Sequence, residues 1–318
     1  MTDSLRALLT NVIDYAGLFP PAKLPLDQSA ANYIQYKRSP NAWMVGGFVC
    51  TVNHLPALAK QPALGRLSNL PLALVATPAE SLDEARSSLR ADLQAAQSFV
   101  DEVAATCGVA VRVAIEWRLP PDAAEDNHGI VRAVECIPDD IAVPLESVAC
   151  EVPLSAVASH AQTAGSFQWR TNVKLGLKFR TGGLEAAAFP TSATLAQAFA
   201  DCIKHGTPWK CTAGLHHPLP RIDAGVGARM HGFINVLTAS TLGQAHKLDA
   251  TVLQAMLDDE SAKSFDVAED QISWSSPEHG AFSASVAQIT AAREIAMSSF
   301  GSCSCEEPWD DLLALGWL

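Results

Sequence analysis

Two lysines stand at equal distances from a glycine near the ends of two apolar segments. LGLKFRTGG places Lys178 four residues before Gly182, and PWKCTAGLHHP places Lys210 four residues before Gly214. Neighbouring strands lie about 5 Å apart, so lysines at matching positions on adjacent strands bring two ammonium groups together. Repulsion and burial lower the pKa of at least one lysine in such a pair. An uncharged lysine amine attacks carbonyl carbon to form an imine, and this spacing predicts that chemistry.

Strands at regular intervals must position these lysines. Short runs rich in Val, Ile and Leu alternate with segments of helical periodicity, which is the pattern of a (β/α)8 TIM barrel. The eight expected strands are residues 11–17, 43–51, 70–77, 109–119, 147–154, 173–181, 208–215 and 231–239. No glycine-rich dinucleotide loop follows the first run, which argues against an open doubly wound sheet. We expect one TIM-barrel domain over 1–318, with the barrel over about 10–240 and a helical C-terminal extension over about 241–318.

The alternation of side chains along each strand assigns polar residues to the barrel interior. In the run 173–181 the apolar face meets the helices, so Lys178 points inward near the carboxyl ends of the strands, where barrel enzymes keep reacting groups. The expected inward set is Asp14, Arg112, Glu116, Arg118, Glu151, Asn172, Lys174, Lys178, Arg180, Lys210, Thr212, His216 and Asn235. Each unpaired buried ion costs several kcal/mol. Charges that converge on one mouth therefore indicate a catalytic or ligand site, and a self-neutralised ion-pair network is the alternative.

Five segments resemble the deoxyribose-phosphate aldolases and their relatives among the class I, Schiff-base aldolases. KFRTG from Lys178 resembles the sixth-strand Lys-x-x-Thr-Gly, and KCTAGLH from Lys210 is similar to the seventh-strand pattern. VIDYAGLFPPA, FVCTVN and VACEV resemble the first, second and fifth strands. The resemblance covers roughly residues 10–240. It implies the barrel fold and a lyase that acts through an imine on Lys178, with Lys210 perturbing that lysine.

The sequence departs from this family where the family binds its substrate phosphate. GLHHPLPR and FINVLTAS lack a Gly/Ser-rich anion nest, so we expect a small polar, non-phosphorylated carbonyl compound. Arg180 offers a planar fork for a carboxylate, which favours a small oxo acid or sugar acid. The alternative is that Arg180 only pairs with Glu151 or Glu116. Asp14 or Glu116 is expected to move the proton, and Arg180, Glu151, Thr212, His216 and Asn235 to bind substrate.

Two other readings of the same barrel remain open. Glu116, Glu151, His216 and His231 include the ligand types of a Zn, Mn or Mg site, as in a metal-dependent sugar isomerase, epimerase or hydrolase. A ligand-binding barrel without chemistry is the third reading, since fold alone does not fix function. Cys303 and Cys305 share a spacing at which both can ligate one ion, although buried thiols are the ordinary interpretation. The imine reading itself requires no cofactor.

Composition narrows the partners further. The chain of 318 residues carries 34 acidic against 22 basic residues, a formal net charge of −12. This balance argues against nucleic acid, which needs clustered lysine and arginine. No apolar run reaches membrane length and the start does not have the pattern of a signal peptide. We expect a cytoplasmic protein that binds a small molecule, keeps most of its eight cysteines as buried thiols, and forms a symmetric homo-oligomer as most oligomers do.

Overall fold

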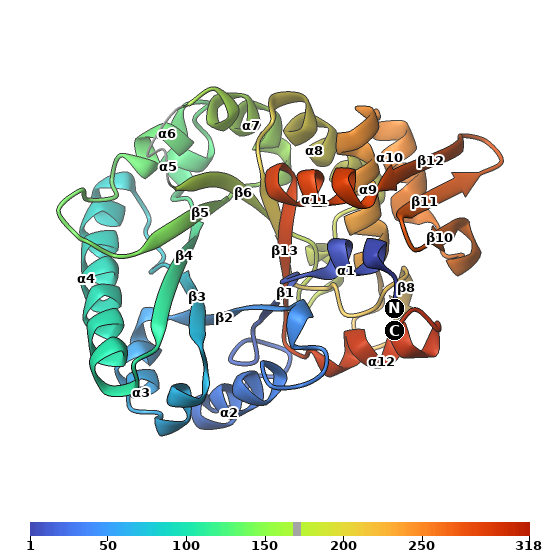
Figure 1. Cartoon of the computed structure of the whole chain (residues 1–318). Coiled ribbons are helices and arrows are strands. Elements are labelled where there is room, and N and C mark those ends of the chain that lie inside the picture. The colour runs from blue at the N-terminus through green and yellow to red at the C-terminus, as the bar shows by residue number, and fades with distance from the viewer. Residues whose placement is uncertain (168–172) are drawn as a thin grey trace.

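Eight parallel strands close into a barrel, which confirms the predicted (β/α)8 fold (Figure 1). The computed structural model describes residues 1–167 and 173–318, so Asn172 lies outside the described residues. The strands, in order around the barrel, are β1 Ile13–Tyr15, β13 Met297–Ser302, β7 Trp209–Thr212, β6 Lys174–Arg180, β5 Leu145–Glu151, β4 Ala110–Arg118, β3 Asn69–Val75 and β2 Val45–Thr51.

Helices surround this barrel on its outer side. They are α1 Asp3–Leu9, α2 Leu26–Tyr36, α3 Leu55–Ala59, α4 Leu82–Cys107, α5 Pro121–Ala124, α6 Gly129–Val134, α7 Val157–Ser166, α8 Ser192–His205, α9 Phe233–His246, α10 Ala250–Asp258, α11 Val286–Ile295 and α12 Glu306–Ala314. Local signals set their ends: Thr191 caps the start of α8 with its side chain, and Gly206 ends that helix in the left-handed conformation. No described helix combines the length and apolar character needed to cross a bilayer.

The eighth barrel strand is β13, and the prediction of a strand at 231–239 is wrong. That segment enters α9, a helix that is buried through its first three turns. A short apolar run is compatible with a buried helix as well as with a buried strand, because both elements bury the side chains on all their faces. β13 pairs with β7 on one side and with β1 on the other. The barrel therefore continues to Ser302, beyond the expected boundary at 240.

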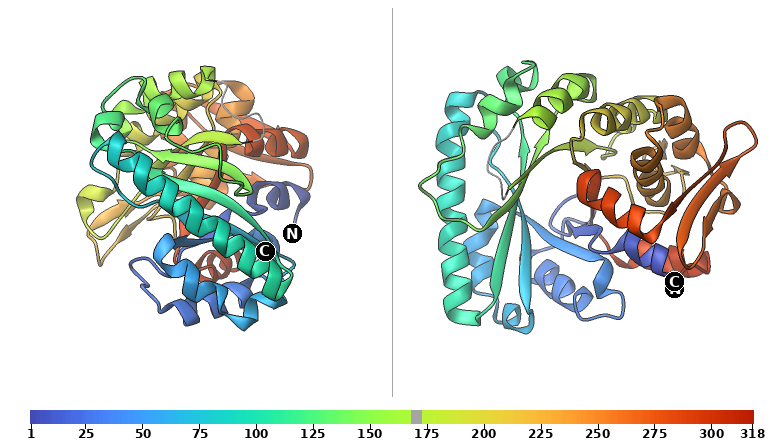
Figure 2. Two further views of the ribbon diagram at one scale, coloured as in Figure 1. Left: turned by 90° about the vertical axis from the view of Figure 1, so that its left-hand side faces the viewer. Right: turned by 45° about the horizontal axis from the view of Figure 1, so that its top comes forward.

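The region after α9 contains the helices α10, α11 and α12 and also a small antiparallel sheet. This sheet comprises β10 Phe265–Val267, β11 Gln271–Ser276 and β12 Gly280–Ser285. It stands at the side of the barrel and packs against α9 and α11 (Figure 2). A separate hairpin of β8 Arg221–Asp223 and β9 Ala228–Met230 follows β7. The C-terminal region thus contributes both a covering layer and one barrel strand.

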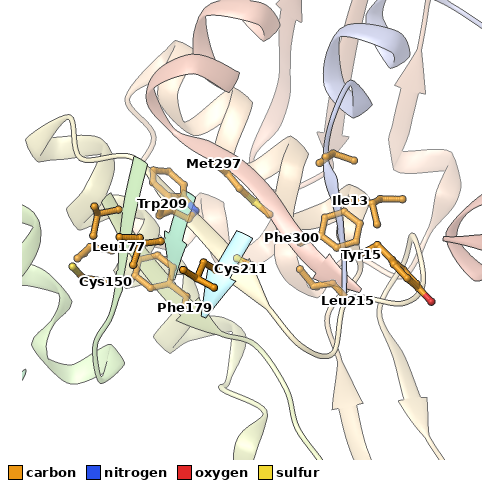
Figure 3. Close-up of a cluster of buried hydrophobic side chains, with 14 of the residues drawn as sticks. Ile13, Tyr15, Cys150, Leu177, Phe179, Trp209, Cys211, Leu215, Met297 and Phe300 are labelled. Atoms are coloured by element: carbon orange, nitrogen blue, oxygen red, sulfur yellow. The ribbon is translucent and has the colours of Figure 1, made fainter. Parts of the chain in front are cut away.

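The outward faces of five strands form an apolar cluster that fixes the direction of the inward residues (Figure 3). Leu177 and Phe179, predicted to meet the helices, are fully buried. Phe179 stacks with Phe199 of α8 at 6.2 Å and with Trp209 of β7 at 6.4 Å between ring centroids. Because Lys178 lies between two outward residues, its side chain is directed into the barrel.

The repeated glycine holds the ends of β6 and β7 together. A Cβ atom on Gly182 would lie 2.7 Å from the Cα of Gly214, and Gly214 has a φ of 76°, so both positions favour glycine. The Thr181 hydroxyl donates to the Ala213 carbonyl at 2.6 Å across the same contact. Lys178 and Lys210, each four residues earlier, are direct partners in the strand register. The Lys-x-x-small-Gly repeat therefore sets two lysines side by side.

All eight cysteines are free thiols. Six are buried, and Cys107 and Cys303 are partly exposed. The prediction that most are buried thiols is confirmed.

Candidate active site

Glu116 joins the two lysines inside the barrel. Its Oε1 accepts from the Lys210 ammonium at 2.5 Å, and its Oε2 accepts from the Lys178 ammonium at 2.8 Å. All three side chains are buried, with the Lys178 side chain 7% exposed. One carboxylate thus holds two cations on the neighbouring strands β6 and β7. Glu116 itself lies on β4, which is separated from β6 by β5.

Asp14 fixes Lys210 from the first strand. Its Oδ2 accepts from Lys210 at 2.6 Å and from the Ser299 hydroxyl at 2.6 Å, while its Oδ1 accepts from the backbone N–H of Gly47 at 2.7 Å. Gly46 passes so close that a Cβ there would lie 2.6 Å from Asp14 Oδ1. Neighbouring strands β2 and β13 therefore lock this carboxylate in one position.

Glu151 is a second carboxylate partner of Lys178, and its side chain is more exposed than that of Glu116. Its Oε2 is 3.1 Å from the Lys178 ammonium, and its Oε1 is 3.1 Å from Nη2 of Arg180. The Arg180 side chain is 52% exposed. Arg180 therefore pairs with Glu151, which was the alternative expected from the sequence. The group as a whole contains three carboxylates and three cations.

The pairing sets the protonation of the cluster. Burial raises the pKa of Glu116, but the charges of Lys210 and Lys178 outweigh burial and lower this pKa to about 2. Burial likewise raises the pKa of Glu151, and Lys178 with Arg180 brings it below its usual value. For Lys210, burial lowers the pKa, and Asp14 with Glu116 raises it above the usual lysine value. Lys210 therefore stays protonated, in keeping with the expectation that it is the cation beside Lys178.

Acid is expected to destabilise the fold through Glu116. Its folded pKa of about 2 lies below the usual 4.5, so its stabilisation is complete above pH 4.5 and is lost as pH falls towards 2. Urea unfolding of the wild type should show a lower midpoint at pH 3 than at pH 6. Glu116→Gln should lose less stability over this interval, whereas Glu102→Gln on the exposed face of α4 should match the wild type. Equal losses in wild type and Glu116→Gln would refute an ionised, charge-paired Glu116.

A cavity of about 800 Å³ opens at the carboxyl ends of β3 to β6. Glu151 and Arg180 line it together with Arg118 from the end of β4. Lys178 contacts Glu151 and therefore lies directly behind this lining. Lys178, Lys210 and Asp14 do not line the cavity themselves, and Lys178 is connected to it through its contact with Glu151.

Three predicted site residues lie outside the cluster. His216 faces α12, with its Nδ1 3.2 Å from Glu307 Oε2. Asn235 belongs to α9 and donates to the carbonyls of Met256 and Asp259, each at 2.7 Å. His231 donates from Nε2 to the Pro190 carbonyl at 2.9 Å. Thr212, in contrast, ends β7 in register with Arg180 at the mouth.

The proposed metal ligands do not converge. His216 and His231 are engaged at the contacts above, while Glu116 and Glu151 bind lysines. Within residues 1–167 and 173–318, no three His, Cys, Asp or Glu side chains form a group able to hold a metal ion. Burial raises the pKa of both Cys303 and Cys305, as expected for buried thiols. The described geometry thus favours the lysine cluster over the metal set.

Sequence reasoning missed Ser299 because it placed the eighth strand elsewhere. Ser299 lies on β13 and donates to Asp14. The segment MSSFGS has only two large apolar residues, Met297 and Phe300, so its strand signal is weak. Gly47 contributes through its backbone, which no side-chain pattern indicates.

Comparisons with family models, with curated proteins and with solved structures found no match to the chain. The fold and the site geometry are therefore the basis on which function is argued.

Proposed function

We propose that the protein is a lyase of the class I aldolase type, with Lys178 as the nucleophile. The observation that carries the proposal is the lysine pair: one carboxylate, Glu116, holds both ammonium groups, and Lys178 also contacts Glu151, which lines the cavity. Lys210 is fixed by Asp14 as a permanent cation beneath it. A lysine must be uncharged to act as a nucleophile, and a neighbouring cation disfavours the charged form of an amine.

The reaction begins when Lys178 releases a proton and its amine adds to a substrate carbonyl carbon. The carbinolamine loses water and becomes a protonated imine. A base takes the proton of the hydroxyl on the carbon beta to the imine carbon, and this oxygen becomes the carbonyl oxygen of the first product. The bond between the alpha and beta carbons breaks, and its electron pair converts the imine into an enamine. Protonation of the enamine carbon and addition of water release the second product and restore the lysine.

Glu151 is suited to move these protons. It contacts Lys178 and lines the cavity, and its lowered pKa keeps it an available base at neutral pH. Glu116, with a pKa of about 2, remains a carboxylate that holds the lysines in place. Asp14 positions Lys210. The role expected for Asp14 or Glu116 in proton transfer therefore passes to Glu151 in this proposal.

A ligand-binding barrel without chemistry is the second candidate. One observation favours it: every charge in the cluster has a partner, as in an inert ion-pair network. Such a network would hold Lys178 protonated and unreactive. The two candidates make opposite predictions about covalent modification.

Borohydride trapping separates the candidates. Purified protein is incubated with acetaldehyde, pyruvate, glycolaldehyde or dihydroxyacetone, reduced, digested and mapped by mass spectrometry, with samples lacking borohydride as controls. The proposal expects a reduced adduct on Lys178 and none on Lys210. An unmodified Lys178 with every compound would support the ligand-binding barrel. Activity that disappears with a chelator and returns with added metal, without a Lys178 adduct, would instead favour metal chemistry.

A further inference from the structure

Glu151 shows that the site accommodates a carboxylate between Lys178 and Arg180. One oxygen lies 3.1 Å from the Lys178 ammonium and the other lies 3.1 Å from the Arg180 guanidinium. The two oxygens of a carboxylate are separated by a single carbon atom. A substrate carboxylate that replaces Glu151 on Arg180 therefore places its neighbouring carbon close to the Lys178 nitrogen. That neighbouring carbon is the carbonyl carbon of a 2-oxo acid.

Arg118 supplies a second cation to the lining of the same cavity. It ends β4 as the register partner of Glu151, which is in turn the partner of Lys178. Its side chain is exposed to the cavity and has no ion pair or hydrogen bond with any residue of 1–167 or 173–318. A guanidinium without a partner at a cavity wall is free to bind a ligand carboxylate through two parallel hydrogen bonds.

The other acidic residues of the cavity favour an orientation in which a bound carboxylate faces the arginines. Glu80 follows β3 and Glu125 follows α5, so both are carried by loop segments. The arginines are carried by the strand ends beside Lys178. An anion is repelled from the loop side and attracted to the strand side, which orients its charged end towards the lysine.

The remaining walls are apolar. They include Leu119, Pro121, Val152, Leu154 and Pro190. Within the described residues, no Ser, Thr, Asn, Gln, His, Tyr or Trp lines this cavity. Sugar hydroxyls need hydrogen-bond partners when they leave water, and these walls offer few. A hydrocarbon substituent suits them, because its transfer from water is favourable.

We propose that the substrate is a 4-hydroxy-2-oxo acid with an apolar substituent on its fourth carbon. The inference rests on the proposed lyase function and names its substrate class. Arg180 and Arg118 bind the carboxylate, Lys178 forms the imine at the second carbon, and the substituent lies along the apolar walls. Release of Glu151 from Arg180 frees a carboxylate oxygen to act as the base.

Lys178 and the ketone form the imine with loss of water. Glu151 takes the proton of the 4-hydroxyl, the bond between the third and fourth carbons breaks, and an apolar aldehyde leaves. The electron pair forms the enamine of pyruvate, which takes the proton back from Glu151 at its third carbon. Water then hydrolyses the imine, and pyruvate leaves.

Two matched compounds test this assignment. 4-Hydroxy-2-oxo-4-phenylbutanoate and 4-hydroxy-4-phenylbutan-2-one share a carbon skeleton, and both release benzaldehyde, which is followed by its absorbance. Only the first has a carboxylate. We expect the wild type to prefer the acid in kcat/KM by about 10- to 100-fold, the effect of one or two charge-assisted hydrogen bonds. Borohydride adducts on Lys178 are measured for both.

Substitutions of the two arginines test whether they cause the preference for the acid over the ketone. Arg118→Gln should lower the ratio of acid to ketone kcat/KM by about tenfold, since it removes one guanidinium contact, and Arg118→Lys should restore part of that ratio. Arg180→Gln should lower the ratio as well. Arg66→Gln removes the same charge from an exposed position distant in sequence from the strands of the site and should keep the wild-type ratio.

The outcomes distinguish the two proposals. Equal kcat/KM for acid and ketone, with adducts on Lys178, would overturn the substrate class while the lyase proposal stands. A preference for the acid that both Arg118→Gln and Arg180→Gln leave unchanged would also overturn it, because the carboxylate would then bind elsewhere. No adduct on Lys178 from either compound would overturn the lyase proposal, and with it the assignment of its substrate.

Discussion

Replacing Lys178 with methionine is expected to abolish adduct formation and to lower kcat for carbon–carbon cleavage by at least about 10³-fold. Methionine keeps an unbranched chain of similar length but cannot form an imine. Fixation of the substrate next to Glu151 does not replace the electron-accepting imine. Stopped-time assays with excess enzyme and mass spectrometry after borohydride reduction measure the two effects independently.

Lys178→Met also removes a cation between Glu116 and Glu151, so charge must be controlled. Lys178→Arg keeps the positive charge and should be equally unreactive, because guanidinium stays protonated. Lys174→Met changes a lysine on the same strand that is exposed and distant from the carboxylates, and it should keep wild-type activity. Turnover in Lys178→Arg near the wild-type level would end the imine mechanism.

Replacing Lys210 with methionine is expected to move imine formation to higher pH and to slow trapping at pH 7 by about tenfold or more, since each pH unit of displacement changes the uncharged fraction tenfold. Without Lys210, one oxygen of Glu116 loses its counter-charge, and the net negative field holds the Lys178 proton more firmly. Trapping rates between pH 6 and 10 test this displacement.

The same variant should lose stability. Asp14 and Glu116 both remain buried without Lys210, and removing one partner of a buried pair costs about 3–5 kcal/mol. Urea unfolding measures the loss. Lys210→Arg keeps the charge and should restore much of the trapping at pH 7. Lys210→Gln removes the charge but keeps a polar side chain, so a comparison with Lys210→Met separates the loss of charge from the burial of an apolar group. A pH profile of Lys210→Met that coincides with the wild type would show that Lys210 does not activate Lys178.

The strand alternation made much of the site predictable. Charged or small residues alternate with large apolar ones in most of 109–119 and 173–181, and a barrel has one interior to receive the charged ones. Glu116, Lys178 and Lys210 were placed together for this reason, and the structure brings them into contact. Asp14 and Glu151 joined them from weaker runs.

The errors have physical causes. His216 was assigned by continuing the alternation past the end of β7, but Ala213 and Gly214 have positive φ values of 64° and 76°, which turn the chain and break the period of two. Asn235 was assigned through a strand that is the helix α9. The pKa argument from sequence weighed only the two lysines against each other. Contacts with Asp14 and Glu116 raise the pKa of Lys210, which remains the neighbouring cation that was expected.

The seam between β1 and β13 gives the barrel a strict order of assembly. Ile13 pairs with Phe300, Asp14 with Gly301 and Tyr15 with Ser302, so closure joins residues separated by almost the whole chain. During synthesis on the ribosome, the first strand must wait, with one edge unpaired, until the last strand has left the exit tunnel. Contacts so distant in sequence form slowly, because the intervening chain must first be ordered. Asp14 gains Ser299 only at that final step, so the carboxylate that holds Lys210 has its full set of hydrogen bonds only after β13 pairs with β1.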